Sequence, residues 1–213
     1  MKKNENKRYD IIGDIHGHFD KLTNHLKKLG YRRREDGTIH HPEGRTVLFL
    51  GDYIDRGEHN RETLHLVKGM VDTGTAKALM GNHEFKAVLM ETRGPDGKYL
   101  RPSSESTDRT RAEFNDFPGE WNEWINWFKE LPMWLDFGDF RAVHANWDEK
   151  SMNLIGNRTL KDDNFLIAAG TKGTPEFNAV EIILKGHELR LPEGVSFLDK
   201  DGNERTKTRA RWW

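Results

Sequence analysis

Four short apolar segments each end just before a polar residue that could carry chemistry. They span residues 9–12, 47–50, 76–80 and 140–143, and they precede GDIHG, GDYIDRG, GNHE and His144, respectively. Short apolar runs beside glycine are typical of buried strands. We therefore expect four strands whose ends present polar side chains.

Helical patterns separate these predicted strands. Apolar residues recur at helical spacing in residues 19–29, in residues 64–71 after Asn60 as a plausible N-cap, and in residues 121–131 before Pro132. Alternating strands and helices predict an α/β fold, in which ligands bind outside the carboxyl ends of the strands. The four polar endings are expected to converge on one edge.

The composition limits the class of protein. The chain has 213 residues, 34 Lys and Arg against 35 Asp and Glu, and a net charge of −1. This length suits one domain, and the balanced charge argues against a general nucleic-acid binder. Residues 1–10 lack the apolar stretch of a signal peptide, and no segment approaches the length of a membrane span. A cytoplasmic protein with no membrane partner is expected.

The strand ends offer ligands for cations. The chain has no cysteine, so any metal must be held by nitrogen or oxygen atoms. Two divalent cations about 3.5–4 Å apart need a bridging carboxylate, imidazoles and neutral oxygens if they are to bind phosphate and acidify water. Asp52 is the natural bridge. Alone, each such Asp or Asn could be a turn former, and each such His a hydrogen-bonded core residue.

The order of the motifs is specific. GDIHG (13–17), GDYIDRG (51–57) and GNHE (81–84), followed by VHA (143–145), resemble the motifs of calcineurin-like metallophosphoesterases. Within that superfamily they resemble the phosphoprotein-phosphatase branch, which includes bacterial and phage Ser/Thr phosphatases and symmetrical diadenosine tetraphosphatases. The resemblance implies a single domain built as a four-layer α/β/β/α sandwich, with two sheets face to face and helices outside.

The resemblance also implies two divalent metal ions. Asp14, His16 and Asp52 would hold the first metal, whereas Asp52, Asn82 and His144 would hold the second. Mn²⁺ is the first expectation for both sites, with Fe, Zn or Ni as alternatives.

Three further motif residues receive catalytic roles from the resemblance. Arg56 would clamp the phosphate oxygens, and His83, oriented by Asp55, would protonate the leaving group. Glu84 would support the ligands from behind. The alternatives are a surface arginine that closes a turn and a histidine that caps the helix beginning near Glu84.

The implied reaction is hydrolysis of a phosphate monoester by a metal-bridging hydroxide. A phosphorylated protein, with phosphoserine or phosphothreonine, is the first substrate expected, and a small phosphate ester is also compatible. A dinucleoside polyphosphate such as diadenosine tetraphosphate is the closest alternative. A non-catalytic phosphate-binding scaffold is the alternative from another class, although binding alone would not need His83 and Arg56.

Residues 93–118 are polar and rich in Gly, Pro and Ser. Such a segment predicts a long surface loop or lid.

Residues 195–212 predict a hairpin that turns at an Asp-Gly pair. Its second strand would place Arg205, Lys207, Arg209 and Arg211 on one face. This strip either protects an edge strand from aggregation or docks an anionic substrate or partner.

One ligand of the second metal is open. Relatives of this type supply a further imidazole from a late Gly-His pair, and Gly186-His187 is the candidate. Thr174 as N-cap and Pro175 as first residue predict a helix over 175–185, which would place His187 away from the sheet edge. The ligand could instead lie beyond residue 213, and the domain would then be incomplete at its C-terminus.

Overall fold

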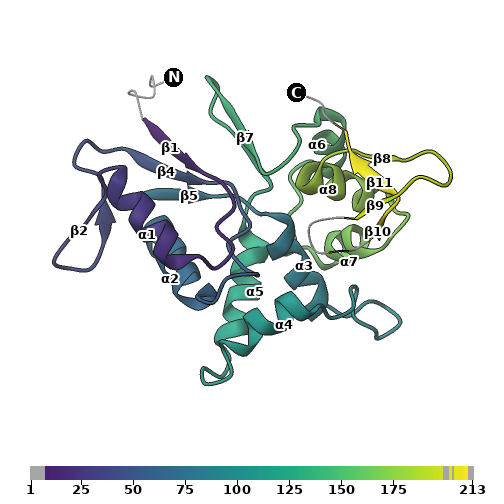
Figure 1. Cartoon of the computed structure of the whole chain (residues 1–213), viewed down its shortest axis with the longest axis horizontal. Helices are drawn as coiled ribbons and strands as arrows, with labels where there is room; N and C mark the ends of the chain where they lie inside the picture. The colour runs from purple at the N-terminus through teal and green to yellow at the C-terminus, as the bar shows by residue number, and fades with distance from the viewer. Residues whose placement is uncertain (1–7, 199–201, 203, 211–213) are drawn as a thin grey trace.

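The computed structural model describes residues 8–198, 202 and 204–210 (Figure 1). The helices are α1 (Phe19–Lys28), α2 (Asn60–Asp72), α3 (Asn82–Glu91), α4 (Glu105–Ala112), α5 (Glu120–Glu130), α6 (Glu149–Ile155), α7 (Asp163–Gly170) and α8 (Pro175–Lys185). The strands are β1 (Tyr9–Ile12), β2 (Arg32–Arg33), β3 (Ile39–His40), β4 (Thr46–Phe49), β5 (Ala76–Ala78), β6 (Trp134–Asp136), β7 (Arg141–Val143), β8 (Glu188–Arg190), β9 (Phe197–Leu198), β10 (Glu204–Arg205) and β11 (Lys207–Arg209).

The first three predicted strands form one parallel sheet in the order β1-β4-β5. Ile12 pairs with Phe49, and Phe49 pairs with Ala78. Because all three strands run the same way, their carboxyl ends meet at one edge, where the motif loops begin. The expected α/β class is confirmed.

The fourth predicted strand lies in a different sheet, which corrects the expectation of a single edge. β7 pairs antiparallel with β6, and this two-stranded sheet packs on the parallel one through Leu48, Leu79 and Ala142. Neighbouring residues of a strand point to opposite faces. Val47 and Phe49 therefore face the helical core while Leu48 faces the second sheet.

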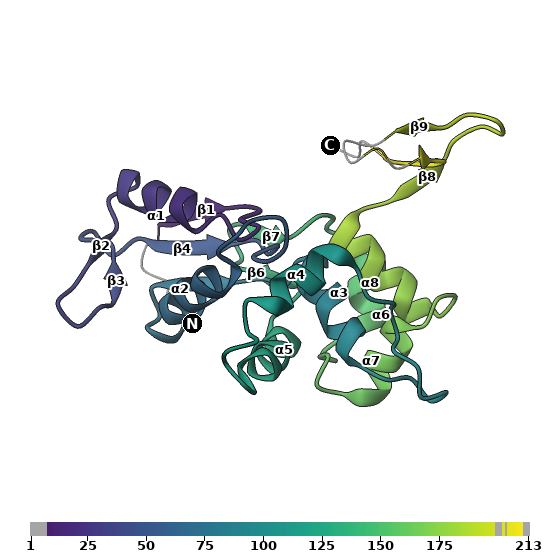
Figure 2. The ribbon, with the colours of Figure 1, turned by 60° about the horizontal axis from the view of Figure 1, so that its bottom comes forward.

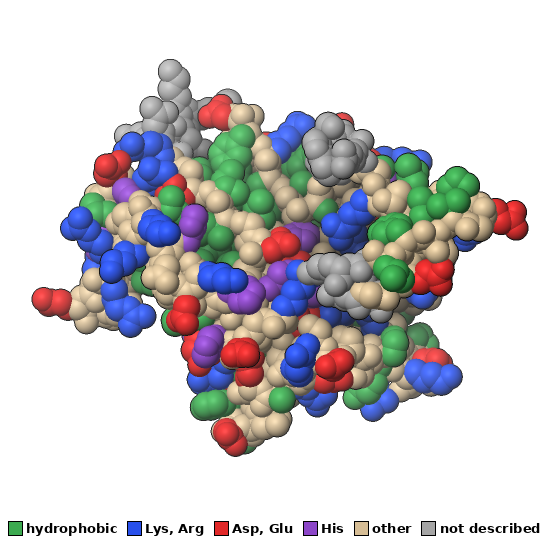
Figure 3. All heavy atoms as spheres, in the orientation of Figure 1, with side chains coloured by type: hydrophobic (Ala, Val, Ile, Leu, Met, Phe, Trp, Pro, Cys, Tyr) green, Lys and Arg blue, Asp and Glu red, His purple; other side chains and the backbone are tan. Residues whose placement is uncertain are grey.

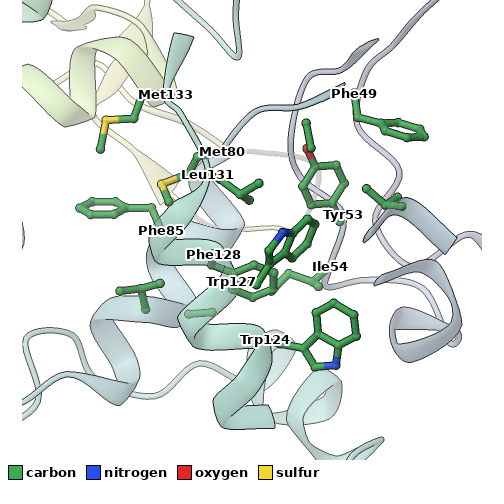
Figure 4. Packing of buried hydrophobic residues seen from close by; sticks show 14 of the residues in the cluster. Phe49, Tyr53, Ile54, Met80, Phe85, Trp124, Trp127, Phe128, Leu131 and Met133 are labelled. Carbon is green, nitrogen blue, oxygen red and sulfur yellow. The ribbon is translucent and has the colours of Figure 1, made fainter. Parts of the chain in front are cut away.

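Helices α1 and α2 present apolar stripes at the predicted spacing, and their buried residues join one large core with the inner face of the sheet. Aromatic side chains fill the region between the sheet and α5 (Figure 4). Tyr53 and Phe128 are fully buried there, and the Trp127 ring lies 6.1 Å from that of Tyr53. This packing supports the loop that carries GDYIDRG.

The segment 93–118 is only in part a loop. It contains α4, in which Thr107 and Thr110 are each only 1% exposed. Their spacing of three residues places them on one helical face, turned toward the protein interior. The sequence-based expectation missed this helix because its face is polar and therefore lacks an apolar stripe.

The predicted C-terminal hairpin is also corrected. β10 pairs with β9, whereas β11 pairs with β8, so the second strand is divided between two partners. Arg205 is therefore in the strand that pairs with β9, whereas Lys207 and Arg209 are in the strand that pairs with β8. Arg211 lies outside the described residues. Strands β8 to β11 together form a segment that we call the C-terminal ribbon. It follows α8 and extends from the body of the molecule (Figure 2). Among the described residues, no helix is long and apolar enough to cross a membrane.

Candidate metal and phosphate site

Backbone hydrogen bonds join the loops that follow β1 and β4. The N–H groups of Ile15 and His16 both donate to the Asp52 carbonyl oxygen at 2.9 Å, and Gly17 N–H donates to the Tyr53 carbonyl oxygen at 2.7 Å. The first two motifs therefore form one rigid unit at the edge of the sheet.

The backbone of this unit is strained at the residues that sequence analysis singled out. Among the described residues, the non-glycine residues with positive φ are His16, Asp52, Asp55 and Arg56, at 51° to 73°. Such conformations cost on the order of 1–3 kcal/mol each and concentrate at functional sites. All four are predicted site residues, so the strain marks the same place as the motifs.

Two glycines allow the loops to approach closely. Gly51 has a φ of 103°, and a Cβ there would lie 2.4 Å from the Gly81 nitrogen. A Cβ on Gly81 would lie 2.3 Å from Asp52 Oδ1. Any larger residue at position 81 would therefore displace the carboxylate at the centre of the site. Gly13 meets no such neighbour, so glycine is not needed there for close approach.

Asp52 lies at the centre of three imidazoles. Its Oδ2 is 3.7 Å from His16 Nε2 and 3.8 Å from His83 Nε2, and its Oδ1 is 3.6 Å from His144 Nε2. The residue is only 3% exposed. His144 comes from the second sheet, so contact between the two sheets completes the cluster.

The two histidines predicted as ligands each place Nε2 beside the Asp52 carboxylate. His16 Nδ1 donates to the Ile54 carbonyl oxygen at 2.9 Å, and His144 Nδ1 donates to that of Leu50 at 2.7 Å. These hydrogen bonds fix both rings, and His16 Nε2 is buried without a hydrogen-bond partner. Burial is the main cause that lowers the pKa of His16, so its ring is neutral at pH 7.

A cation between these atoms would satisfy the unpartnered His16 Nε2 and the carboxylate oxygens beside it. The remaining predicted ligands extend this arrangement, since Asp14 Oδ2 lies 3.7 Å from His16 Nε2 and Asn82 Oδ1 lies 3.3 Å from His144 Nε2. Histidines that bind metals commonly donate their other N–H to a carbonyl, as both do here. The structure thus brings all five predicted ligands together, and the donor set fits divalent cations.

Two overlapping groups of ligand atoms could hold a cation. One consists of Asp14, Asp52 and His144, and the other of His16, Asp52 and His83. Asp52 is common to both, which agrees with the bridge expected from sequence. The second group contains His83 as a possible ligand, a role that sequence analysis did not consider.

His83 and Asp55 form the expected pair. His83 Nδ1 lies 2.6 Å from Asp55 Oδ2, and the same oxygen accepts a hydrogen bond from Lys86 Nζ at 2.6 Å. Burial alone would raise the pKa of Asp55, but the partners His83 and Lys86 hold it well below its usual range. His83 does not cap α3, because Gly81 is the N-cap and His83 N–H donates to Asp52 Oδ1.

Sequence analysis missed three partners of Asp55. Besides Lys86, Thr107 donates to Oδ2 at 3.1 Å and Thr110 donates to Oδ1 at 2.9 Å. Lys86 follows His83 by three residues on α3, a spacing that already placed both on one face. The threonines had no such local signal, because their partner lies more than fifty positions away along the chain.

Thr110→Val is expected to destabilise the protein more than Thr107→Val. Among the described residues, Asp55 Oδ1 accepts only from Thr110, whereas Oδ2 keeps His83 and Lys86 when Thr107 is replaced. A buried acceptor left without a donor costs about 1–3 kcal/mol. Urea denaturation of both variants measures the difference. Thr110→Ser retains the hydroxyl and should restore stability, and equal losses in the two valine variants would contradict this hydrogen-bond assignment.

Glu84 supports the site from inside. Its carboxylate accepts hydrogen bonds from the backbone N–H groups of Asp52, Tyr53 and Gly81 at 2.8 to 3.0 Å. Burial, followed by the charge of Asp52, raises the pKa of Glu84 to about 8, although these hydrogen bonds favour its ionised form. Glu84 thus holds the second and third motifs together.

Arg56 is exposed at the rim, with a φ of 73°. Burial is the main cause that lowers the pKa of His16, and the charges of His83 and then Arg56 add to it. Arg56 lies in the same loop as Asp52 and Asp55, on the solvent side of the cluster.

The site combines a buried carboxylate shared by two groups of candidate metal ligands with an exposed arginine and a carboxylate-held histidine. This arrangement is suited to binding divalent cations and a phosphate group. The chain belongs to the calcineurin-like phosphoesterase family, whose model matches residues 7–191. The expected metallophosphoesterase fold is thereby confirmed.

Curated relatives carry a more specific name. A bis(5'-nucleosyl)-tetraphosphatase PrpE [asymmetrical] of Halalkalibacterium halodurans is 36% identical over 158 residues, which cover 71% of this chain and 62% of the relative. The protein of the same name from Oceanobacillus iheyensis is 28% identical over 178 residues, 78% of this chain and 66% of the relative. The chain therefore spans about three-fifths of the length of these relatives.

Solved structures are similar at lower identity. A putative diadenosine tetraphosphatase is 18% identical with a TM-score of 0.44, and the match covers 67% of this chain and 52% of that one. A cold-active protein-tyrosine phosphatase of a psychrophilic Shewanella is 22% identical with a TM-score of 0.47, covering 81% and 58%, respectively.

Proposed function

We propose that this protein hydrolyses dinucleoside polyphosphates, such as diadenosine tetraphosphate, at a two-metal site with Mn²⁺ as the first candidate. The observation that carries the proposal is the Asp52 cluster, in which imidazole nitrogens lie 3.6 and 3.7 Å from carboxylate oxygens and His16 Nε2 is buried without a hydrogen-bond partner. The names of the curated relatives favour this substrate. The Ser/Thr phosphoprotein substrate expected first from sequence receives no such support.

In this proposal the ligands divide as the sequence suggested, because Asp14 lies 3.7 Å from His16 and Asn82 lies 3.3 Å from His144. One of the two ligand groups described above differs in that it places Asp14 with His144. Asp14, His16 and Asp52 would hold one metal, and Asp52, Asn82 and His144 the other. Bound metals of this kind acidify water and neutralise phosphate charge. The protein's own contribution is to fix the orientation of the two imidazoles through the Ile54 and Leu50 carbonyl oxygens.

The remaining residues would act on the substrate. Arg56 would bind the non-bridging oxygens of the phosphate under attack, because a guanidinium is always charged and can donate two parallel hydrogen bonds. His83 Nε2, whose ring is held at Nδ1 by Asp55, would donate a proton to the oxygen that leaves. In the alternative, a non-catalytic phosphate-binding scaffold, Arg56 and His83 would have no catalytic role.

Hydrolysis assays on three substrates test the proposal. Diadenosine tetraphosphate, a phosphoserine peptide and p-nitrophenyl phosphate are compared after metal depletion and after Mn²⁺ is restored. We expect activity to return with Mn²⁺ and kcat/KM to be highest for the dinucleotide. Chromatography identifies the cleaved bond, since asymmetrical cleavage yields ATP and AMP whereas symmetrical cleavage yields only ADP. A higher kcat/KM on the phosphopeptide would overturn the proposed substrate.

His187→Ala is expected to leave metal binding unchanged. The helix predicted before it is confirmed as α8, with Thr174 Oγ1 accepting from Phe177 N–H, and His187 lies exposed beyond Gly186. Among the described residues, His187 belongs to neither candidate cation group. Calorimetric titration with Mn²⁺ compares the variant with the parent. Because even residues that only support ligands cost about 10–100-fold in metal affinity, a loss of that size would show that His187 reaches the second metal.

A further inference from the structure

A groove begins beside the metal site and extends toward the C-terminal ribbon. It has a volume of about 1230 Å³, and its walls are residues 94–102, the exposed face of α8 and residues 204–209 of the ribbon. Asn82, the proposed ligand of the second metal, also lines it. The groove therefore reaches the metal and phosphate site at Asn82.

The walls carry an excess of positive charge. Seven Lys and Arg side chains line the groove against four Asp and Glu. Lys185 and Lys207 have acidic partners in Glu181 and Glu188. Arg101 and Arg209 form no ion pair within the described part of the chain, although Arg101 is half-buried. Arg209 is exposed, so Arg101 is the partly buried one of the two, and cations without counter-charges favour an anionic ligand.

The position of Arg101 indicates how far that ligand would extend. Its backbone N–H donates to the Leu89 carbonyl oxygen at 3.3 Å. Leu89 follows Asn82 by seven residues on α3, which corresponds to about 10 Å at 1.5 Å per residue. A single phosphate group at the metals would not span this distance, so cations here would serve a substrate that continues beyond the phosphate under attack.

Exposed aromatic rings accompany the cations. Tyr99 is 48% exposed and Phe197 is 44% exposed, and both line the groove. Aromatic rings of this kind stack on nucleobases without regard to sequence. A groove with both cations and rings suits a nucleoside polyphosphate better than an acidic peptide, which offers carboxylates but no base.

We infer that this groove binds the nucleoside polyphosphate portion of the substrate that extends away from the metals, with Arg101, Lys207 and Arg209 on its phosphates. The inference rests on the proposed function and names the part of the protein that selects the substrate. In the view of Figure 3, Lys and Arg side chains lie beside the histidines at the middle of the molecule. Part of the predicted basic strip thereby receives a binding role instead of edge protection.

Binding of a non-hydrolysable imido analogue of ATP to the Mn²⁺-supplemented full chain tests the inference without turnover. Arg101→Ala and Arg209→Ala are each expected to weaken binding about tenfold, the effect of one lost charged hydrogen bond. Arg190→Ala is the matched control. Arg190 lies opposite Lys207 in the β8–β11 strand pairing but does not line the groove. Phe197→Ala should weaken binding of the analogue but not of tripolyphosphate.

Several results would overturn the inference. The first is that the parent does not bind the analogue. The second is that Arg190→Ala weakens binding of the analogue as much as Arg101→Ala does. The third is that the parent binds an acidic phosphopeptide more tightly than the analogue. Equal binding of the analogue and tripolyphosphate would overturn the role of the base.

Turnover separates the groove from the proposed function. Arg101→Ala and Arg209→Ala should raise KM for diadenosine tetraphosphate and leave p-nitrophenyl phosphate hydrolysis unchanged, since that ester does not reach the groove. Loss on both substrates would indicate damage to the metal site. If the parent failed to hydrolyse the dinucleotide but still bound the analogue, the proposed function would fail while the groove assignment would stand.

Discussion

Asp52→Asn is expected to lower kcat/KM more than any other single ligand change. Asp52 lies within 4 Å of three imidazoles and is shared by both candidate cation groups. Its replacement by an amide removes the negative charge between the two cations. We expect a loss greater than the about 10–100-fold that supporting residues cost, together with weaker binding of both metals. Mn²⁺ titration and steady-state kinetics measure the two effects.

The fold should survive this substitution. The amide keeps the shape of the carboxylate, so its Oδ1 can still accept from His83 N–H and fit beside Gly81. Its NH₂ group could also donate to His16 Nε2, which has no hydrogen-bond partner. Asp72→Asn, at the exposed C-terminal end of α2, is a matched control that should leave turnover and metal binding unchanged. Two tightly bound metals and normal turnover in Asp52→Asn would refute the bridging assignment.

His83→Asn is expected to slow substrates with poor leaving groups by about 10²–10⁴-fold, the usual contribution of a general acid. p-Nitrophenyl phosphate should be affected far less, because a stable phenolate hardly needs a proton. Comparison of p-nitrophenyl phosphate with an alkyl phosphate such as phosphoserine measures this dependence.

Metal content decides between the two roles open to His83. His83 belongs to one candidate cation group, and its Nδ1 contacts the Asp55 carboxylate, a contact that suits either role. If His83 is the general acid proposed above, His83→Asn keeps its metals. Metal loss with equal slowing of both substrates would make His83 a ligand instead of an acid.

The sequence alone determined features that depend on neighbouring residues. Strands bounded by glycine, the amphipathic stripes of α1 and α5, and the Thr174-Pro175 start of α8 were all predicted, because capping and periodicity are local properties of the chain. The five candidate ligands were also selected from the sequence, since each lies within a few residues of the end of a strand, and the structure brings them together.

Tertiary packing decided what local patterns do not contain. The sequence did not indicate that the strand before His144 pairs in a second sheet, or that α4 turns two threonines toward Asp55. Nor did it indicate that β11 pairs with β8, which places Lys207 in a groove beside the metal site. These contacts join residues far apart along the chain, and they form only where burial of apolar surface brings the elements together.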